Sequence, residues 1–388
     1  MEKDLQSSQS FRPAYGFNEI ALSPSLVTLD PELVDISTTI ANIKLKIPIF
    51  GSAMDSVVSP KSAVKMGKLG ALGILNLEGV QTRYENAEEI LAKIANISKD
   101  KYVPLMQKIY QENEVKDELV IARIKEIKDQ GVPAVVSVTP QRAVRLGELA
   151  VKAGAEALLI QSTVVSANYK SKNLASILDL KKFCQEMPIP VMVGNTATYP
   201  VTLSLLETGV QGIFVGIGPG AACTTRGVLG IGIPMATSIT DCAAARDDYY
   251  RKTGKYVPII GDGGFVVSGD ICKALACGAD AVMIGSPFAR AKEAPGNGYH
   301  WGMATPNALL PRGARIRVGT IGTLEEILLG PSNTDDGSQN LAGAIKTAMA
   351  TLGAQNIREM HQIEVLKAPS LMTEGKVYQK AQNLGMYK

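Results

Sequence analysis

The sequence predicts a (β/α)8 barrel, in which eight parallel strands alternate with helices around a closed sheet. Eight short apolar runs lie along residues 47–286; four begin at a proline, four follow a glycine, and the two kinds alternate strictly. Runs rich in Val and Ile are typical of strands buried on both faces of a parallel sheet. Helical patterns separate the runs, and the segment has the usual barrel length of about 250 residues. The alternative architecture is a doubly wound open sheet.

The strands and helices are expected in a regular order. The proline-led strands are 47–51, 132–136, 189–194 and 257–261, and the glycine-led strands are 70–75, 154–160, 209–215 and 278–284. Each glycine ahead of a strand stands where a helix C-cap is expected. The clearest helices between the strands are 141–153, 174–186, 199–208, 240–253 and 268–277.

The remaining segments complete a single catalytic domain over residues 1–388. Residues 1–46 lead into the first strand, and residues 80–130 are charged helix formers that predict surface helices. Residues 287–388 are expected to form a flap, a closing helix at 340–352 and a polar tail.

Composition restricts the classes of protein that fit. Hydrophobic residues make up 46% of the chain and charged residues 20%, which is ordinary for a globular protein. The net charge of +3 is spread along the chain, so neither nucleic acid nor an anionic membrane is an expected partner. No apolar run approaches the ~20 residues that span a bilayer, and the N-terminus shows no apolar signal core. Five cysteines without a CxxC pair and two histidines argue against zinc and indicate a reduced, cytoplasmic protein.

The active site of such a barrel lies at the C-terminal ends of its strands. Two neighbouring ends predict an anion site, because Gly263 and Gly264 follow the seventh strand and Gly285 and Ser286 follow the eighth. Backbone amides of such turns converge on a phosphate group. Asp262 is placed to accept hydrogen bonds from sugar hydroxyls. The alternative is that these glycines only make turns.

The loop after the sixth strand, 216–226, predicts a nucleophile. Its three glycines lead to Cys223, which two threonines and Arg226 follow. A thiolate becomes a good nucleophile where positive charge or helix amides lower its pKa. Carbonyl groups clustered in the loop could bind a monovalent cation. The alternative, a buried structural cysteine, is the reading for the four cysteines in predicted helices: Cys184, Cys242, Cys272 and Cys277.

These motifs together resemble the IMP dehydrogenase / GMP reductase family over most of the chain. The loop that carries Cys223 is the most specific of them. The matching segments, in order, are 17–22, 34–37, 52–55, 194–195, 218–226, 261–264, 285–286 and 293–296.

The resemblance implies a role for each site residue. Cys223 would attack C2 of the purine base, and Thr225 would assist the group that leaves or enters. The implied substrate-binding residues are Ser52, Met54, Asn195, Asp262, Gly263, Gly264, Gly285, Ser286, Gly302 and Met303, with His300 or Tyr299 as further phosphate contacts. The implied cofactor-binding residues are Gln161, Ser162, Thr163 and Gly194, and carbonyls of Gly218, Gly220 and Cys223 would bind K⁺.

The family divides between two reactions that share a covalent thioimidate. Three features favour the NADPH-dependent reductive deamination of GMP to IMP. The interval 80–130 is too short for the paired regulatory CBS insert of typical dehydrogenases. The segment 304–321 has no Arg-Tyr pair, which the dehydrogenases use to activate water. Gln161 replaces the usual acidic residue after the fourth strand, which suits the more anionic cofactor.

Two departures from the reductase pattern leave alternatives open. The stretch 312–314 lacks the Glu that handles ammonia protons in the reductases, and Ala221 replaces a phosphate-binding Ser. The alternatives are an IMP dehydrogenase that forms XMP with NAD⁺, a purine nucleotide-binding homologue without turnover, and a flavin-dependent barrel oxidoreductase. The resemblance also implies a homo-oligomer, either a tetramer or a stacked octamer.

Overall fold

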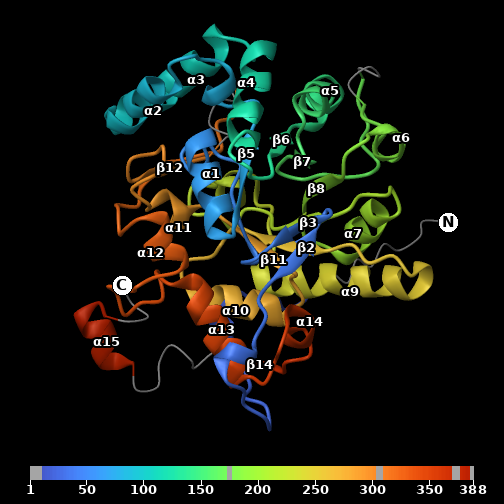
Figure 1. Cartoon of the computed structure of the whole chain (residues 1–388), viewed down its shortest axis with the longest axis vertical. Helices are drawn as coiled ribbons and strands as arrows, with labels where there is room; N and C mark the ends of the chain where they lie inside the picture. Colours follow the sequence, from blue (N-terminus) through green and yellow to red (C-terminus); the bar gives the residue numbers. More distant parts are fainter. Residues whose placement is uncertain (1–10, 173–176, 303–308, 369–375, 385–388) are drawn as a thin grey trace, which may run out of the picture.

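The computed structural model describes residues 11–172, 177–302, 309–368 and 376–384. Eight parallel strands form a closed barrel in the order β10-β11-β4-β5-β6-β7-β8-β9, which confirms the predicted fold (Figure 1). Each predicted strand is one of them. Their bounds are β4 (Ile49–Gly51), β5 (Leu72–Asn76), β6 (Val135–Val138), β7 (Ala157–Gln161), β8 (Val191–Thr196), β9 (Ile213–Val215), β10 (Ile259–Asp262) and β11 (Ala281–Ile284).

Both faces of the barrel strands are buried, which explains their unbroken apolar sequences. In β7, Ala157 and Leu159 belong to the cluster inside the barrel, whereas Leu158 and Ile160 belong to the outer cluster against the helices. Alternate side chains of a strand point to opposite faces, so both sets must be apolar. A hairpin of β2 (Thr38–Ile40) and β3 (Ile43–Leu45) contributes Ile40 and Leu45 to the inner cluster.

Helices surround the barrel close to their predicted positions. Helix α9 begins five residues earlier than expected, at Met235 directly after Pro234, and α6 begins later, at Leu180. The closing helix is α13, which Asn340 caps. The bounds around the barrel are α1 (Pro60–Leu69), α4 (Asp117–Lys128), α5 (Ala143–Ala153), α6 (Leu180–Glu186), α7 (Tyr199–Leu206), α8 (Thr225–Leu229), α9 (Met235–Thr253), α10 (Ser268–Ala276), α11 (Ser286–Ala289), α12 (Leu324–Leu328), α13 (Leu341–Thr351), α14 (Ile357–Met360) and α15 (Val377–Gln382).

The segment 80–130 is more than the surface helices that its charges predict. Helices α2 (Ala87–Asn96) and α3 (Tyr102–Glu112) enclose an apolar cluster of their own, and Trp301 is fully buried in it. Trp301 ends β12 (Tyr299–Trp301), which pairs with β13 (Arg315–Arg317) at the base of the flap. Figure 1 shows α2 and α3 side by side at one corner of the molecule. These helices thereby form a small lobe that packs against the flap's base.

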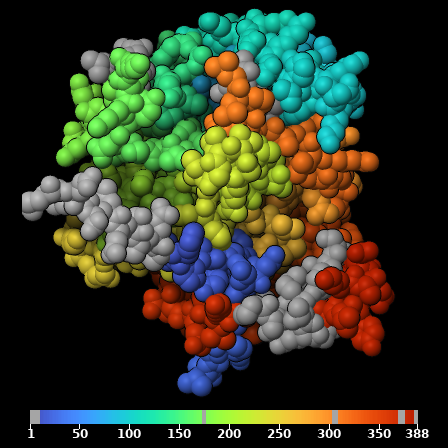
Figure 2. All heavy atoms as spheres, turned by 180° about the vertical axis from the view of Figure 1, so that it is seen from behind, coloured from blue at the N-terminus to red at the C-terminus, as the bar shows by residue number. Residues whose placement is uncertain are grey.

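A strand near the N-terminus pairs with a strand near the C-terminus on one side of the barrel. Strand β1 (Ile20–Leu22) pairs antiparallel with β14 (Val365–Lys367). Figure 2 shows the blue N-terminal residues beside red C-terminal residues at the lower end of the molecule. Within the described residues, no helix is both long and apolar enough to cross a bilayer.

Candidate active site

A cavity of about 890 Å³ opens at the C-terminal ends of the barrel strands. It brings together nearly all the residues that the sequence singled out: Ser52, Met54, Gln161, Ser162, Thr163, Asn195, Gly218, Gly220, Cys223, Thr225, Asp262, Gly263, Gly264, Gly285, Ser286 and Gly302. Gly194, expected at the cofactor, is not part of the cavity wall; it packs so closely on Phe214 that a Cβ would lie 2.9 Å from the Phe214 carbonyl oxygen. Met303 lies outside the described residues.

Cys223 differs from the other cysteines in its surroundings. It is half-buried and lines the cavity, and its Sγ donates a hydrogen bond to Thr225 Oγ1 at 3.2 Å. Burial raises the pKa of the Cys242 and Cys272 thiols to about 12, so these two remain protonated and unreactive. The geometry therefore leaves Cys223 as the thiol that a ligand in the cavity can meet.

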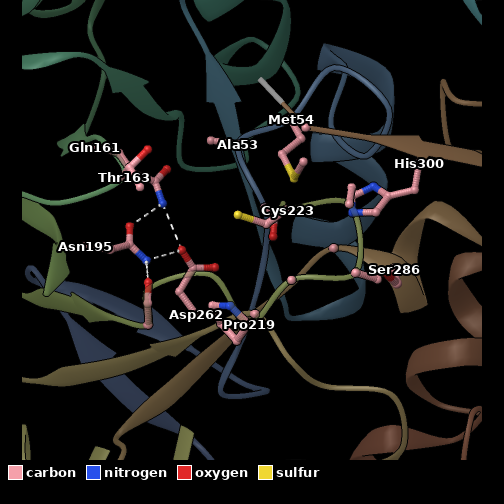
Figure 3. Close-up of a pocket in the computed structure, with 18 of the residues that line it drawn as sticks. Ala53, Met54, Gln161, Thr163, Asn195, Pro219, Cys223, Asp262, Ser286 and His300 are labelled. Atoms are coloured by element: carbon pink, nitrogen blue, oxygen red, sulfur yellow. Dashed lines mark hydrogen bonds between the residues drawn. The ribbon is translucent and has the colours of Figure 1, made fainter. Parts of the chain in front are cut away.

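A buried cluster of two amides and one carboxyl forms one side of the site (Figure 3). Gln161 Nε2 donates to Asn195 Oδ1 at 3.0 Å and to Asp262 Oδ2 at 2.9 Å. Asn195 Nδ2 donates to the same Asp262 oxygen at 2.7 Å and to the Gly216 carbonyl at 2.9 Å. Burial raises the pKa of Asp262 to about 6, although the two amides favour its ionised form. The Oδ1 atom of Asp262 stays available for a ligand hydroxyl.

The glycine-rich loops after β10 and β11, where the sequence predicts an anion site, both line the cavity. Gly263 and Gly264 have φ angles of +82° and +81°, a region that favours glycine. A Cβ on Gly285 would lie 3.1 Å from His300 Nε2, so a larger residue there would crowd the His300 ring. Burial lowers the pKa of His300 to about 4, which keeps the ring neutral near pH 7, and its Nδ1 hydrogen-bonds with Ser56 Oγ at 3.1 Å.

The segment after the flap forms another wall, and the sequence did not single out its most important residue. Gly313 pairs antiparallel with Cys223, since Thr224 N donates to the Arg312 carbonyl at 3.2 Å and Ala314 N donates to the Ala222 carbonyl at 2.8 Å. Arg312 lines the cavity, and its Nη1 donates to Thr163 Oγ1 at 3.3 Å. The Arg312 backbone therefore lies beside the cysteine loop, and its guanidinium lies against Thr163 at the end of β7. The feature of the sequence that could have indicated Arg312 is the group of three arginines at 312, 315 and 317.

The α2–α3 lobe also reaches the site. Tyr110 of α3 lines the cavity and donates its hydroxyl to Asp55, which directly follows the 52–54 loop. Asp55 also accepts a hydrogen bond from Val80 N at 2.9 Å, and burial raises its pKa. Arg83 lies over the Tyr110 ring, 5.3 Å from its centroid. The segment 80–130, which the sequence predicted as surface helices, is thereby connected to the loop after the first barrel strand.

The potassium site stays a prediction. Carbonyls of Gly218, Gly220 and Cys223 would have to meet beside Arg226, whose Nε already donates to the Ile217 carbonyl at 3.3 Å. The Gly220 carbonyl accepts the Cys223 amide at 2.9 Å. In the part of the chain that is described, no three His, Cys, Asp or Glu side chains gather closely enough to hold a metal ion.

Fold and site together define a (β/α)8 barrel with a cavity at its C-terminal mouth, in which a loop cysteine lies between the glycine loops after β10 and β11 and a polar amide–carboxyl cluster. The family model described as IMP dehydrogenase / GMP reductase domain matches residues 14–377, so the chain belongs to this family of oxidoreductases. An uncharacterized oxidoreductase of Mycolicibacterium smegmatis is 36% identical over 369 residues, which cover 93% of this chain and 98% of that protein. An IMP dehydrogenase/GMP reductase-like protein from Corynebacterium glutamicum superposes with a TM-score of 0.87 at 34% identity, covering 94% of this chain and 96% of the other.

Two other relatives are named inosine-5′-monophosphate dehydrogenase. The protein of Cryptosporidium parvum is 31% identical over 378 residues, with 89% of each chain covered. That of Borreliella burgdorferi is 31% identical over 395 residues, covering 90% of this chain and 92% of its own. Such coverage leaves no room in either protein for a further hundred-residue insert. The lack of that insert therefore does not separate reductases from dehydrogenases.

Proposed function

We propose that this chain oxidises IMP to XMP through a covalent intermediate on Cys223. The thiolate forms a bond to C2 of the purine, and the hydride leaves C2 for NAD⁺. A water molecule then adds to C2 of the resulting thioimidate and loses a proton, and the C2–S bond breaks to release XMP and the thiol. The sequence alone favoured a different reaction, the reduction of GMP to IMP. We choose the oxidation of IMP because of the position of Arg312.

The position of Arg312 carries this proposal. The step that distinguishes a dehydrogenase is the attack of water, which needs a group that orients the water and takes up its proton. Resemblance to the dehydrogenases implies an Arg-Tyr pair of the flap for that task. Here Arg312 lines the cavity wall beside the cysteine loop, and Gly313 stands in place of the tyrosine. Its hydrogen bond to Thr163 fixes the guanidinium on the side of the site that faces the end of β7.

The carboxylates in the site do not suit the release of ammonia. Among the described residues, only Glu78 and Asp262 line the cavity with a carboxyl group. Glu78 accepts hydrogen bonds from Thr139 N at 2.5 Å and pairs with Arg142 at 3.2 Å. Asp262 accepts two amide hydrogen bonds. Neither belongs to the stretch 312–314, where the reductase pattern requires a glutamate.

The other residues bind and orient the substrate. Met54 would contact the purine, Asp262 Oδ1 would accept a ribose hydroxyl, and the glycine loops after β10 and β11 would bind the phosphate. Thr225 Oγ1, which accepts a hydrogen bond from Sγ, is positioned to hold the incoming water beside the thioimidate. Asp262 and Thr225 are held in place by hydrogen bonds within the barrel mouth, so these two side chains need little ordering on binding.

A nicotinamide cofactor would lie beside the nucleotide in the same cavity. Polar side chains at the ends of β5, β6 and β7 line the side opposite the anion site, and they fit a ribose and amide: Asn76, Ser137, Thr139, Gln161, Ser162 and Thr163. When bound there, the cofactor supplies the hydride acceptor. Gln161 would hold a cofactor hydroxyl while its amide keeps Asp262 in place.

GMP reductase remains the second candidate because of two observations. Gly313 stands directly after Arg312, where the dehydrogenases carry a tyrosine, and Gln161 is neutral. This reading predicts NADPH as the reductant, and it requires a proton donor for ammonia other than a flap glutamate.

Product analysis distinguishes the candidates. Purified protein is incubated with IMP and NAD⁺ or NADP⁺, and separately with GMP and NADPH, and the nucleotides are separated by chromatography. We expect XMP and a reduced cofactor from IMP, and no product with the Cys223→Ala variant. IMP formed from GMP would overturn the direction, and nucleotide binding without either product would identify a homologue without turnover.

A further inference from the structure

Three arginines line the cavity within the described residues, and they differ in how their charges are used. Arg83 donates to the carbonyls of Glu78, Tyr110 and Asn113, at 3.1, 3.1 and 2.5 Å. Arg312 donates to Thr163. Among described residues, the Arg290 guanidinium makes no hydrogen bond or ion pair, and its Nε atom is buried without a partner. A half-buried guanidinium with an unsatisfied donor indicates a missing anionic ligand.

The backbone places Arg290 next to the anion loops. It follows the last residue of α11, the short helix that begins at Ser286, so Arg290 and Ser286 are four residues apart and on one face. Arg290 N donates to the Pro287 carbonyl at 3.3 Å, and the Arg290 carbonyl accepts from Ile321 N at 3.0 Å. These bonds fix the root of the side chain beside the loop that carries Gly285 and Ser286.

The anion end of the cavity has no other described cation. His300 is neutral near pH 7 because burial lowers its pKa to about 4. Ala221 lines the wall without a side-chain donor. Figure 3 shows His300 and Ser286 on one side of Cys223 and the Asp262 cluster on the other. A dianionic phosphate bound only by backbone amides, Ser286 and a neutral imidazole would lack a counter-charge.

We infer that Arg290 binds the 5′-phosphate of the substrate nucleotide and makes the site selective for nucleoside monophosphates over nucleosides. The planar guanidinium offers two parallel donors to a phosphate, which suits a site that must recognise a dianion. This inference builds on the proposed purine nucleotide chemistry, but it concerns binding and not the direction of the reaction. It assigns a task to a side chain whose Nε lacks any partner in the described chain.

Binding measurements test the inference independently of turnover. Trp301 is the only tryptophan in the sequence and lies between His300 and Gly302, both of which line the cavity, so a change in its fluorescence during titration would give one measure of affinity. IMP, GMP and inosine are titrated into wild type, Arg290→Gln, Arg290→Lys and a control, Arg317→Gln, whose arginine is exposed on β13. Calorimetry provides the second measure of affinity.

Loss of a charged hydrogen bond predicts that Arg290→Gln binds IMP and GMP about 10- to 100-fold more weakly and inosine unchanged. Arg290→Lys should regain part of the affinity, and Arg317→Gln should bind like wild type. Equal weakening for IMP and inosine would assign Arg290 a structural role and overturn the inference, as would unchanged IMP affinity. If Arg290→Gln does not fold, the Lys variant decides: it must weaken IMP binding relative to inosine. If the variants show the expected pattern but wild type turns over neither IMP nor GMP, the proposed function is refuted and the inference stands.

Discussion

Replacing Gln161 by Glu tests the amide–carboxyl cluster most sharply. The change preserves the size of the side chain but puts a carboxylate within hydrogen-bond distance of Asp262, since Gln161 Nε2 now lies 2.9 Å from Asp262 Oδ2. Two carboxyl groups so close cannot both ionise at neutral pH, so the pair retains a proton. The variant thereby removes the charge with which Asp262 would bind a ribose hydroxyl.

The size of the effect follows from the geometry. Asp262 has a pKa of about 6, above its ordinary value, so the wild-type carboxyl is protonated below that pH and ionised above it. The kcat/KM for the nucleotide should therefore rise with pH up to about 6 and then level off. Two unit charges about 4 Å apart repel by about 4 kcal/mol at an effective dielectric constant of 20, which is about 3 pKa units. The acid limb of Gln161→Glu should move to about pH 9, and its kcat/KM at pH 7.5 should fall about 30-fold.

The assay is the pH profile of kcat/KM for IMP, with Gln161→Met as the matched control. Met removes the same amide donor without adding charge, so its acid limb should move upward by a smaller amount. A Gln161→Glu profile that coincides with that of wild type, or with that of Gln161→Met, would refute the assignment of this limb to Asp262.

Three further variants probe other parts of the account. Thr225→Val should slow the release of XMP by about 100-fold and leave the first hydride transfer nearly unchanged. Stopped-flow absorbance would record this as a burst of NADH, and equal slowing of both steps would exclude the proposed role. Tyr110→Phe removes a hydrogen-bond donor from buried Asp55, so the free energy of unfolding in urea should fall by about 1–3 kcal/mol and KM should rise. If neither changes, the α2–α3 lobe does not support the site. Leu159→Ala, inside the barrel, should cost about 2–5 kcal/mol of unfolding free energy, whereas a loss below 1 kcal/mol would contradict its place in the inner cluster.

The barrel was predictable because its signal is local. Both faces of β7 are buried, so an unbroken apolar run marks this strand in the sequence, and the same holds for the other barrel strands. Loops that follow a strand directly, such as Gly263 to Gly264, were placed correctly for the same reason. The early start of α9 was missed, although Pro234 marks it.

What the sequence did not predict depends on contacts between distant segments. Tyr110 reaches the site only because α2 and α3 pack around Trp301, which lies almost two hundred positions away. Arg312 enters the wall through pairing with the Cys223 loop. The resemblance implied Gly194 at the cofactor, yet Gly194 is not part of the cavity wall and packs on Phe214. Arg290 did carry a local signal, a cation four residues after Ser286.

The central claim is that a purine carbon becomes bonded to the sulfur of Cys223 during turnover. Acid quenching of the protein during reaction with IMP and NAD⁺, followed by peptide mass spectrometry, measures this directly. We expect a nucleotide adduct on the peptide that contains Cys223, at a level that rises in Thr225→Val and is absent in Cys223→Ala. XMP formation without any adduct on that peptide, or continued turnover by Cys223→Ala, would contradict the account.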